Sequence, residues 1–119
     1  MPLPLVLVVD DEFLVRMNAV FLLEEAGFGV LEAGNAEEAI ALLESRNDIR
    51  IVFTDINMPG SMDGLRLAHA IRNRWPPIEL LLTSGQVRVR SDDLPARGRF
   101  LSKPYDPNKL VEVVTSFAK

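Results

Sequence analysis

Short apolar runs alternate along this chain with segments whose apolar residues recur three or four positions apart, and this alternation is the strongest constraint on the fold. The first run, 3–9, is continuously apolar, as expected of a strand buried on both faces. The five predicted strands are 3–9, 28–32, 49–54, 78–83 and 100–102. Because helical segments separate most of these strands, the pattern predicts an α/β fold with a parallel sheet covered by helices on both faces.

Four segments are predicted to form helices. Their apolar residues at helical spacing are Phe13, Met17, Val20 and Phe21, then Ala36, Ala39, Ile40 and Leu43, then Leu67, Ala68, Ile71 and Trp75, and finally Leu110, Val113, Val114 and Phe117. Gly27 is expected to end the first helix. Asn35 followed by Glu38 predicts an N-cap with a capping-box-like partner, and Asp106 followed by Pro107 predicts the start of the last helix.

The stretch 86–99 does not follow this pattern. Valines alternate with arginines there, and Pro95 and Gly98 interrupt the segment. We therefore expect no full helix between the last two strands, and at most a short turn at 91–94.

Composition excludes several classes of protein. A chain of 119 residues is long enough for one domain and too short for two. The absence of cysteine excludes disulfides, thiolate nucleophiles and cysteine-based zinc sites. A net charge of −4 without a long Lys/Arg cluster disfavours direct nucleic-acid binding. The apolar run 3–9 is too short to span a bilayer and lacks the flanks of a signal peptide, so we expect a cytoplasmic protein with no membrane association.

Polar residues follow four of the predicted strands. They are Asp10-Asp11, Asp55, Thr83-Ser84-Gly85 and Lys103-Pro104. Ligands of open α/β sheets bind at the carboxyl ends of the strands, so these groups should meet at one shallow site. Three neighbouring carboxylates would repel one another, and Mg²⁺, which prefers oxygen ligands and phosphate, would relieve that repulsion. A carboxylate nucleophile beside Mg²⁺ is a route to an aspartyl phosphate, which Lys103 would neutralise.

Each of these groups also has a structural explanation when it is considered alone. Asp10 and Asp11 are suited to the start of a helix, and Asp55 to a turn. The lone His69 has no second His or Cys to form a metal site with it. Only the common placement of the acids, Thr83 and Lys103 at strand ends favours a shared site.

These residues resemble the receiver domains of bacterial response regulators. The resemblance covers nearly the whole chain and rests on Asp10-Asp11, Thr54-Asp55-Ile56-Asn57-Met58-Pro59, Met62-Asp63-Gly64, Thr83-Ser84-Gly85 and Phe100-Leu101-Ser102-Lys103-Pro104-Tyr105. It implies a doubly wound, flavodoxin-like or CheY-like sheet of five parallel strands in the order 2-1-3-4-5. We expect residues 1–119 to form a single receiver domain without an output domain.

The resemblance also implies roles for individual residues. Asp55 would be the phosphoacceptor. Asp11 would bind Mg²⁺ directly, Asp10 mainly through water, and Asn57 through its backbone carbonyl. Thr83 and Lys103 would contact the phosphoryl oxygens together with the backbone amide of Ser84.

A switch is implied as well. Phosphorylation would draw Thr83 toward the phosphoryl group, and Phe100 would turn into the space that this movement frees. A cis peptide bond is expected at Lys103–Pro104. The loop between Pro59 and Met62 contains one residue more than the commonest family pattern.

The function implied is that of a phosphorelay receiver. A histidine kinase, including a hybrid kinase, or a histidine phosphotransfer protein would donate the phosphoryl group, and the domain would act on an unknown downstream protein as a monomer or weak dimer. We expect a signalling domain that catalyses only its own phosphorylation and dephosphorylation. The alternatives are a receiver-like module that is never phosphorylated, a flavodoxin-like cofactor carrier and a haloacid-dehalogenase-like phosphohydrolase. The last needs a second aspartate where Asn57 stands.

Overall fold

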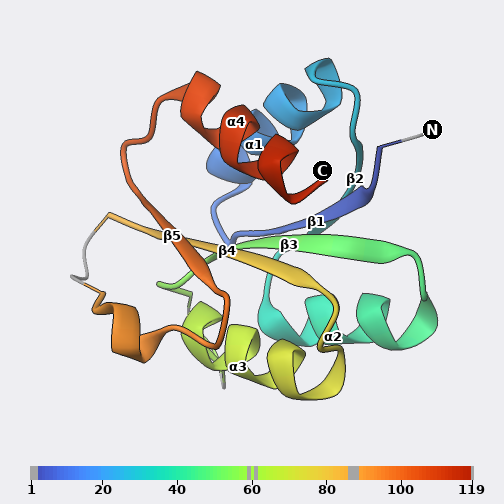
Figure 1. The fold of residues 1–119 in the computed structure, drawn as a ribbon, viewed down its shortest axis with the longest axis vertical. Helices are drawn as coiled ribbons and strands as arrows, with labels where there is room; N and C mark the ends of the chain where they lie inside the picture. The colour runs from blue at the N-terminus through green and yellow to red at the C-terminus, as the bar shows by residue number, and fades with distance from the viewer. Residues whose placement is uncertain (1–2, 59, 61, 86–88, 119) are drawn as a thin grey trace.

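A five-stranded, all-parallel sheet forms the centre of the molecule (Figure 1). The computed structural model describes residues 3–58, 60, 62–85 and 89–118. The strands are β1 (Leu5–Val9), β2 (Gly29–Ala33), β3 (Ile49–Asp55), β4 (Glu79–Ser84) and β5 (Arg99–Ser102). They pair in the order β2-β1-β3-β4-β5, which confirms the predicted fold and strand order.

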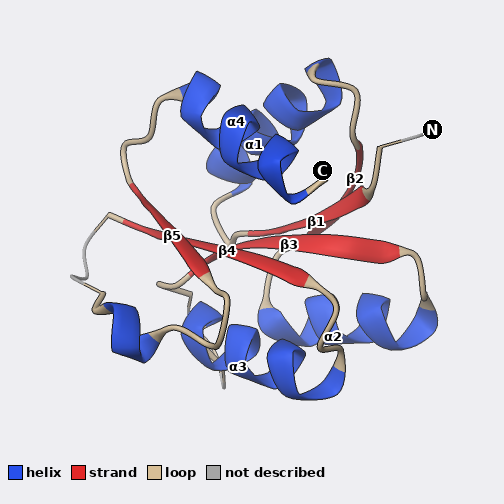
Figure 2. Ribbon diagram, in the orientation of Figure 1, coloured by secondary structure: helices blue, strands red, loops and turns tan. Residues whose placement is uncertain are grey.

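Helices cover both faces of the sheet (Figure 2). They are α1 (Phe13–Glu25), α2 (Ala36–Ser45), α3 (Gly64–Arg74) and α4 (Pro107–Phe117). α1 and α4 lie on one face, and α2 and α3 on the other. Successive residues of β1 point to opposite faces, so Val6 and Val8 pack on the α1/α4 side and Leu7 and Val9 on the α2/α3 side. None of the helices in the described ranges has the length and apolarity needed to cross a bilayer.

The predicted helix starts are present. The Asn35 side chain accepts a hydrogen bond of 2.8 Å from the Glu38 amide. The Glu38 carboxylate accepts its own bond from the Gly34 amide at 2.7 Å, one residue before the cap, so the capping box is modified. Asp106 caps α4, with Pro107 at its first position.

α1 forms where its apolar spacing predicts, but most of those apolar residues face outward. Phe13, Met17 and Phe21 are 59%, 48% and 59% exposed. The buried face of the helix consists instead of Ala19, Val20 and Leu23. Small Ala19 lets the helix approach the sheet closely, and the bulky aromatic residues remain on the surface.

Between β4 and β5, the described residues 89–98 contain only a short 3-10 turn, Ser91–Asp93, which confirms the expected turn. Side chains of α3 hold this segment in place. His69 Nε2 donates to the Asp93 carbonyl at 2.8 Å, and Arg72 Nε donates to the Ala96 carbonyl at 2.7 Å. The predictions for residues 86–88 and for the extra loop residue, beside 59 and 61, lie outside the described residues.

Gly64, the first residue of α3, is in close contact with the end of β3. A Cβ atom at this position would lie 1.8 Å from the Asp55 carbonyl oxygen and 2.9 Å from the Ile56 Cα atom. The Gly64 amide also donates to the Ile56 carbonyl at 3.0 Å. Only glycine therefore lets α3 begin directly against the backbone of Asp55.

We predict that Gly64→Ala destabilises the protein by about 1–3 kcal/mol, the usual cost of overpacking, because backbone atoms must move to admit the methyl group. Urea unfolding followed by circular dichroism measures this free energy. Gly34→Ala is the matched control, since a Cβ there would meet its nearest atom at an ordinary 3.5 Å. Equal stability of the two variants would contradict the close-packing argument.

Candidate functional site

The polar residues predicted at the strand ends do meet at one edge of the sheet. Asp55, the last residue of β3, lies in register with Thr83 of β4, and Ser84 lies in register with Ser102 of β5. Asp10 and Asp11 directly follow β1, whose Val9 lies in register with Thr54. Because all the strands are parallel, their carboxyl ends form a common rim.

Three carboxylates cluster at this rim. Asp10, Asp11 and Asp55 each offer an oxygen within 4.8 Å of the others. Asp10 and Asp55 are buried, with only 5% of each residue exposed, whereas Asp11 is exposed. A cluster of this kind, with one member open to solvent, is suited to a hard divalent cation with oxygen ligands.

Lys103, which follows β5, places its ammonium group beside the two buried acids. Its Nζ atom lies 3.5 Å from Asp10 Oδ2 and 3.6 Å from Asp55 Oδ1. The peptide bond between Lys103 and Pro104 is cis, as expected. The structure thus brings the predicted lysine and the predicted acids together although 93 positions separate Lys103 from Asp10.

Asp55 is electrostatically unsatisfied. Burial raises the pKa of its carboxyl, the positive charge of Lys103 lowers that pKa, and the negative charge of Asp10 raises it again, with a net upward shift. Its Oδ1 atom is buried and has no hydrogen-bond partner. A buried anionic oxygen without a donor fits a metal ion or a transferred group better than it fits a purely structural role.

Asp10 is held more firmly than Asp55. Its Oδ1 atom accepts a hydrogen bond from the Glu12 amide at 2.9 Å, and its amide donates to the Ala33 carbonyl at 3.1 Å. With Oδ2 facing Lys103, both of its carboxylate oxygens are already engaged. Exposed Asp11 is therefore better placed than Asp10 to bind a cation directly.

Thr83 and Asn57 lie at the rim without a hydrogen bond to Asp55 from their side chains. The Thr83 hydroxyl donates to the Leu101 carbonyl at 2.5 Å, toward β5. The Asn57 amide nitrogen donates to the Ser84 hydroxyl at 2.9 Å and so links the loop after β3 to the end of β4.

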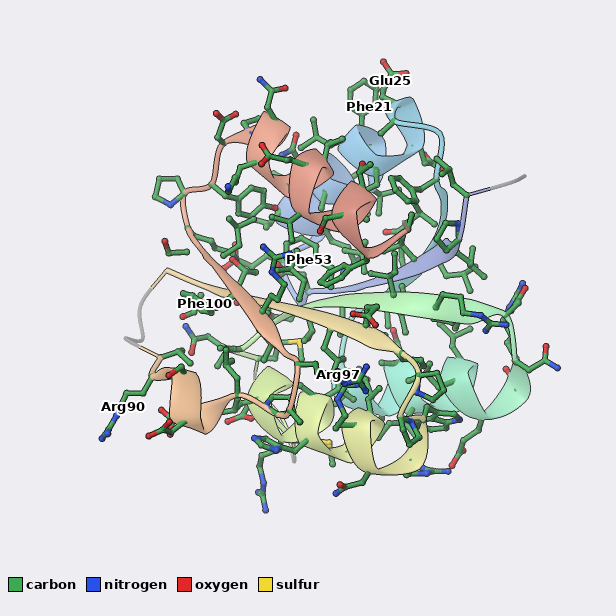
Figure 3. The ribbon with its side chains drawn as sticks, in the orientation of Figure 1. Phe21, Glu25, Phe53, Arg90, Arg97 and Phe100 are labelled. Carbon is green, nitrogen blue, oxygen red and sulfur yellow. The ribbon has the colours of Figure 1, made fainter. Side chains whose placement is uncertain are left out.

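Phe100, the predicted switch residue, lies on β5 one position before Leu101. It is labelled in Figure 3, on the side of the sheet that faces the 3-10 turn. It is partly buried and packs against the core on the α2/α3 face. Thr83 and Phe100 are therefore connected through the strand that accepts the Thr83 hydrogen bond.

Tyr105 lies close to the acid cluster. Burial, with the negative charges of Asp10 and Asp55, raises the pKa of its hydroxyl to about 12. Its ring packs edge-on against Phe53, with the centroids 5.8 Å apart. The phenol therefore stays neutral at physiological pH and forms an apolar wall of the site.

Sequence inspection missed two residues at this site. Gly64 belongs to the Met62-Asp63-Gly64 motif, but the motif does not indicate that Gly64 lies against the Asp55 carbonyl. Arg16 of α1 donates from Nη1 to the Asp10 carbonyl at 2.7 Å. Its position in line with Ala19, Val20 and Leu23 would have indicated a charged side chain on the inward face of the helix.

Comparisons with known proteins agree with this geometry. The family model for the response regulator receiver domain matches residues 6–115. The sensor kinase CckA of Brucella abortus is 35% identical over 113 residues, which are 92% of this chain and 12% of that protein. The aerobic respiration control protein ArcA of Escherichia coli is 30% identical over 118 residues, 92% of this chain and 46% of that protein. This chain thus spans less than half the length of either relative.

A solved structure is also similar. The crystal structure of a response regulator receiver protein from Sinorhizobium medicae superposes with a TM-score of 0.90 at 26% identity, covering 98% of this chain and 94% of that one. Together with the match over residues 6–115, this similarity shows that the chain belongs to the family of response regulator receiver domains, the signalling domains of two-component systems.

Proposed function

We propose that Asp55 of this receiver domain accepts a phosphoryl group from a histidine kinase or a histidine phosphotransfer protein, with Mg²⁺ as the cofactor. The observation that best supports this is the position of Asp55 Oδ1, which is buried without a hydrogen-bond partner, 3.6 Å from Lys103 Nζ. The oxygens of Asp10 and Asp11 within 4.8 Å supply the rest of a cation site.

The reaction is an exchange of one bond for another. A carboxylate oxygen of Asp55 attacks phosphorus, the P–N bond to the donor histidine breaks as the new P–O bond forms, and the imidazole leaves with its electron pair and takes up a proton. Phosphoryl transfer depends mainly on positioning and charge neutralisation, so the side chains at the rim suffice. Lys103 neutralises the transferred group, and Tyr105 lies beside Lys103 in the lining of the neighbouring pocket.

The acids at the rim fit Mg²⁺. Asp10, Asp11 and Asp55 would hold it together with the main-chain carbonyl of Asn57, and the bound ion would supply positive charge against the phosphoryl oxygens. The Oδ1 atom of Asp55 is buried without a hydrogen-bond partner, which supports this fit. Because the phosphoryl group is both gained and lost at Asp55, we propose a signalling domain that acts only on its own phosphorylation state.

Phosphorylation would change the surface through Thr83. The Thr83 hydroxyl donates to Leu101 in the unphosphorylated protein, and phosphoryl oxygens on Asp55 would offer it charged acceptors instead. Breaking the bond to Leu101 would remove a side-chain restraint on the strand position beside Phe100, while the main-chain pairing of β4 and β5 remains. Rearrangement of Phe100 then alters the protein-interaction surface around β5.

The outward face of α1 is suited to receive the phosphodonor protein. Phe13, Leu14, Met17 and Phe21 are 48–75% exposed, and Figure 3 shows Phe21 pointing away from the sheet. Leu14 also lines a pocket of about 590 Å³ whose lining includes Lys103 and Tyr105. An apolar surface continuous with the phosphorylation site lets one partner both dock and deliver its phosphohistidine.

We predict that Asp55→Asn abolishes labelling by acetyl phosphate in the presence of Mg²⁺, because the amide is not a nucleophile. Intact-mass analysis of the wild type with and without Mg²⁺ measures the gain of one phosphoryl group. Asp48→Asn, at an exposed aspartate paired with Arg46 at 2.8 Å, is the control and should be labelled normally. Full labelling of Asp55→Asn would place the acceptor elsewhere.

We predict that the same substitution stabilises the metal-free protein at neutral pH. The raised pKa of Asp55 means that the folded protein binds this proton more tightly than the unfolded chain does, so stability falls as pH rises through that pKa. The asparagine amide does not titrate, so the gain from Asp55→Asn should grow from acidic to neutral pH. Urea unfolding in EDTA across this range measures it, and a gain that shrinks with rising pH would contradict the burial argument.

We predict that Leu14→Ser lowers the rate of phosphotransfer from a protein donor by about tenfold, a loss equivalent to about 1.4 kcal/mol of binding free energy. Labelling by acetyl phosphate should be unchanged, since that donor needs no docking surface. The protein donor is an autophosphorylated histidine kinase found, by screening, to label the wild type. Leu3→Ser, at a leucine that is 41% exposed at the other end of the sheet, is the control. Equal transfer to Leu14→Ser and the wild type would exclude this face.

A further inference from the structure

Arg16 lies on the inward face of α1, where a core residue would be expected. It precedes Ala19, Val20 and Leu23 by three, four and seven positions, so all four side chains point to the same side of the helix. The other three are buried and apolar. The Arg16 side chain is only 16% exposed. A nearly buried charge in an apolar stripe requires a reason beyond packing.

The guanidinium joins two acceptors from different parts of the sheet. Nη1 donates to the Asp10 main-chain carbonyl at 2.7 Å, and Nε donates to Glu32 Oε1 of β2 at 3.0 Å. Arg16 thus connects α1, the end of β1 and the neighbouring edge strand. Because the guanidinium is planar and rigid, the directions of these two hydrogen bonds are fixed relative to each other.

We propose that Arg16 is a positioning residue, which orients the Asp10–Asp11 peptide so that the acids at the end of β1 face a divalent cation. The inference rests on the proposed function. The Asp10 carbonyl and the Asp11 nitrogen belong to one planar peptide unit. Fixing that carbonyl therefore fixes the bond from which exposed Asp11 extends.

Other contacts restrain this turn, but none of those that the structure describes there engages the Asp10 carbonyl itself. The Asp10 amide bonds to Ala33 at 3.1 Å, and its carboxylate bonds to the Glu12 amide at 2.9 Å. The bond from Glu12 closes a ring that includes the Asp10–Asp11 peptide and limits its rotation, and the bond from Arg16 sets the direction of the carbonyl.

Electrostatics alone predicts the opposite effect of removing Arg16. A guanidinium near the acids repels a divalent cation, so the loss of its charge would tighten Mg²⁺ binding. Loss of the oriented carbonyl would weaken it, because residues that orient metal ligands contribute about 10–100-fold to metal affinity. The sign of the change in affinity therefore separates positioning from simple charge.

The test is isothermal titration of unphosphorylated protein with MgCl₂. Arg16→Met should weaken Mg²⁺ binding about tenfold. Arg16→Lys keeps the charge but cannot span both acceptors, so it should bind Mg²⁺ no better than Arg16→Met. Glu32→Leu, which removes the acceptor of the Arg16 Nε hydrogen bond, should show a smaller loss in the same direction. Arg74→Met is the matched control, since Arg74 pairs with Glu44 at 2.7 Å on the exposed surface away from the rim.

A second measurement needs no metal. Amide hydrogen exchange in EDTA should be faster at residues 11 and 12 in Arg16→Met than in the wild type, and unchanged there in Arg74→Met. Unchanged exchange with unchanged or tighter Mg²⁺ binding in Arg16→Met would overturn the inference. If Arg16→Met fails to fold, Glu32→Leu decides the question by the same two measurements.

Failure of the proposed function gives a different result. Asp11→Asn should lose most Mg²⁺ affinity. If it binds Mg²⁺ as the wild type does, or if the wild type binds none, the assigned metal site is wrong. Exchange at residues 11 and 12 then still decides whether Arg16 orients the turn.

Discussion

Two buried carboxylates share one lysine in this structure, and the arrangement of the rim follows from that imbalance. Asp10 and Asp55 lie 3.5 and 3.6 Å from Lys103 Nζ, longer than the 2.7–2.9 Å of a strong charge-assisted hydrogen bond. Neutralisation is therefore incomplete, and the pKa of Asp55 is raised chiefly by its burial. A fold selected only for stability would not keep such a pair, so the rim retains electrostatic strain that a cation or a phosphoryl group would relieve.

The surrounding structure holds these groups in place while leaving one side of the rim adjustable. Gly64 lets α3 start against the Asp55 carbonyl, and Arg16 fixes the turn after β1. Toward β5 the Thr83 hydroxyl adds one side-chain bond, to the Leu101 carbonyl, to the main-chain pairing of β4 and β5. The segment before β5 is a short turn attached to α3 by His69 and Arg72. A phosphoryl group on Asp55 would therefore act on β5 through a side-chain bond that can be exchanged.

The sequence predicted the sheet well because strands leave a strong local signal. Continuous apolar runs end in polar residues, and parallel strands bring those ends together, so the meeting of Asp10, Asp55 and Lys103 followed from pattern alone. The orientation of α1 did not follow, since Phe13 and Phe21 are as apolar as the residues it buries. Contacts such as Arg16 to the Asp10 carbonyl, or Thr83 to Leu101, depend on side-chain direction. Spacing along the chain can indicate the face on which a side chain lies, but not the acceptor that it reaches.

The outward apolar residues of α1 follow from the way in which the helix packs against the sheet. One face of the helix packs against the sheet through Ala19, Val20 and Leu23. Arg16 lies on the same face and donates to the Asp10 carbonyl. The opposite face exposes Phe21 and Leu14, and Leu14 borders the pocket beside Lys103. Burying those side chains would require turning the helix, which would withdraw Arg16 from the Asp10 carbonyl. The contact that we propose to position the acids thus also keeps an apolar surface exposed next to the proposed phosphorylation site.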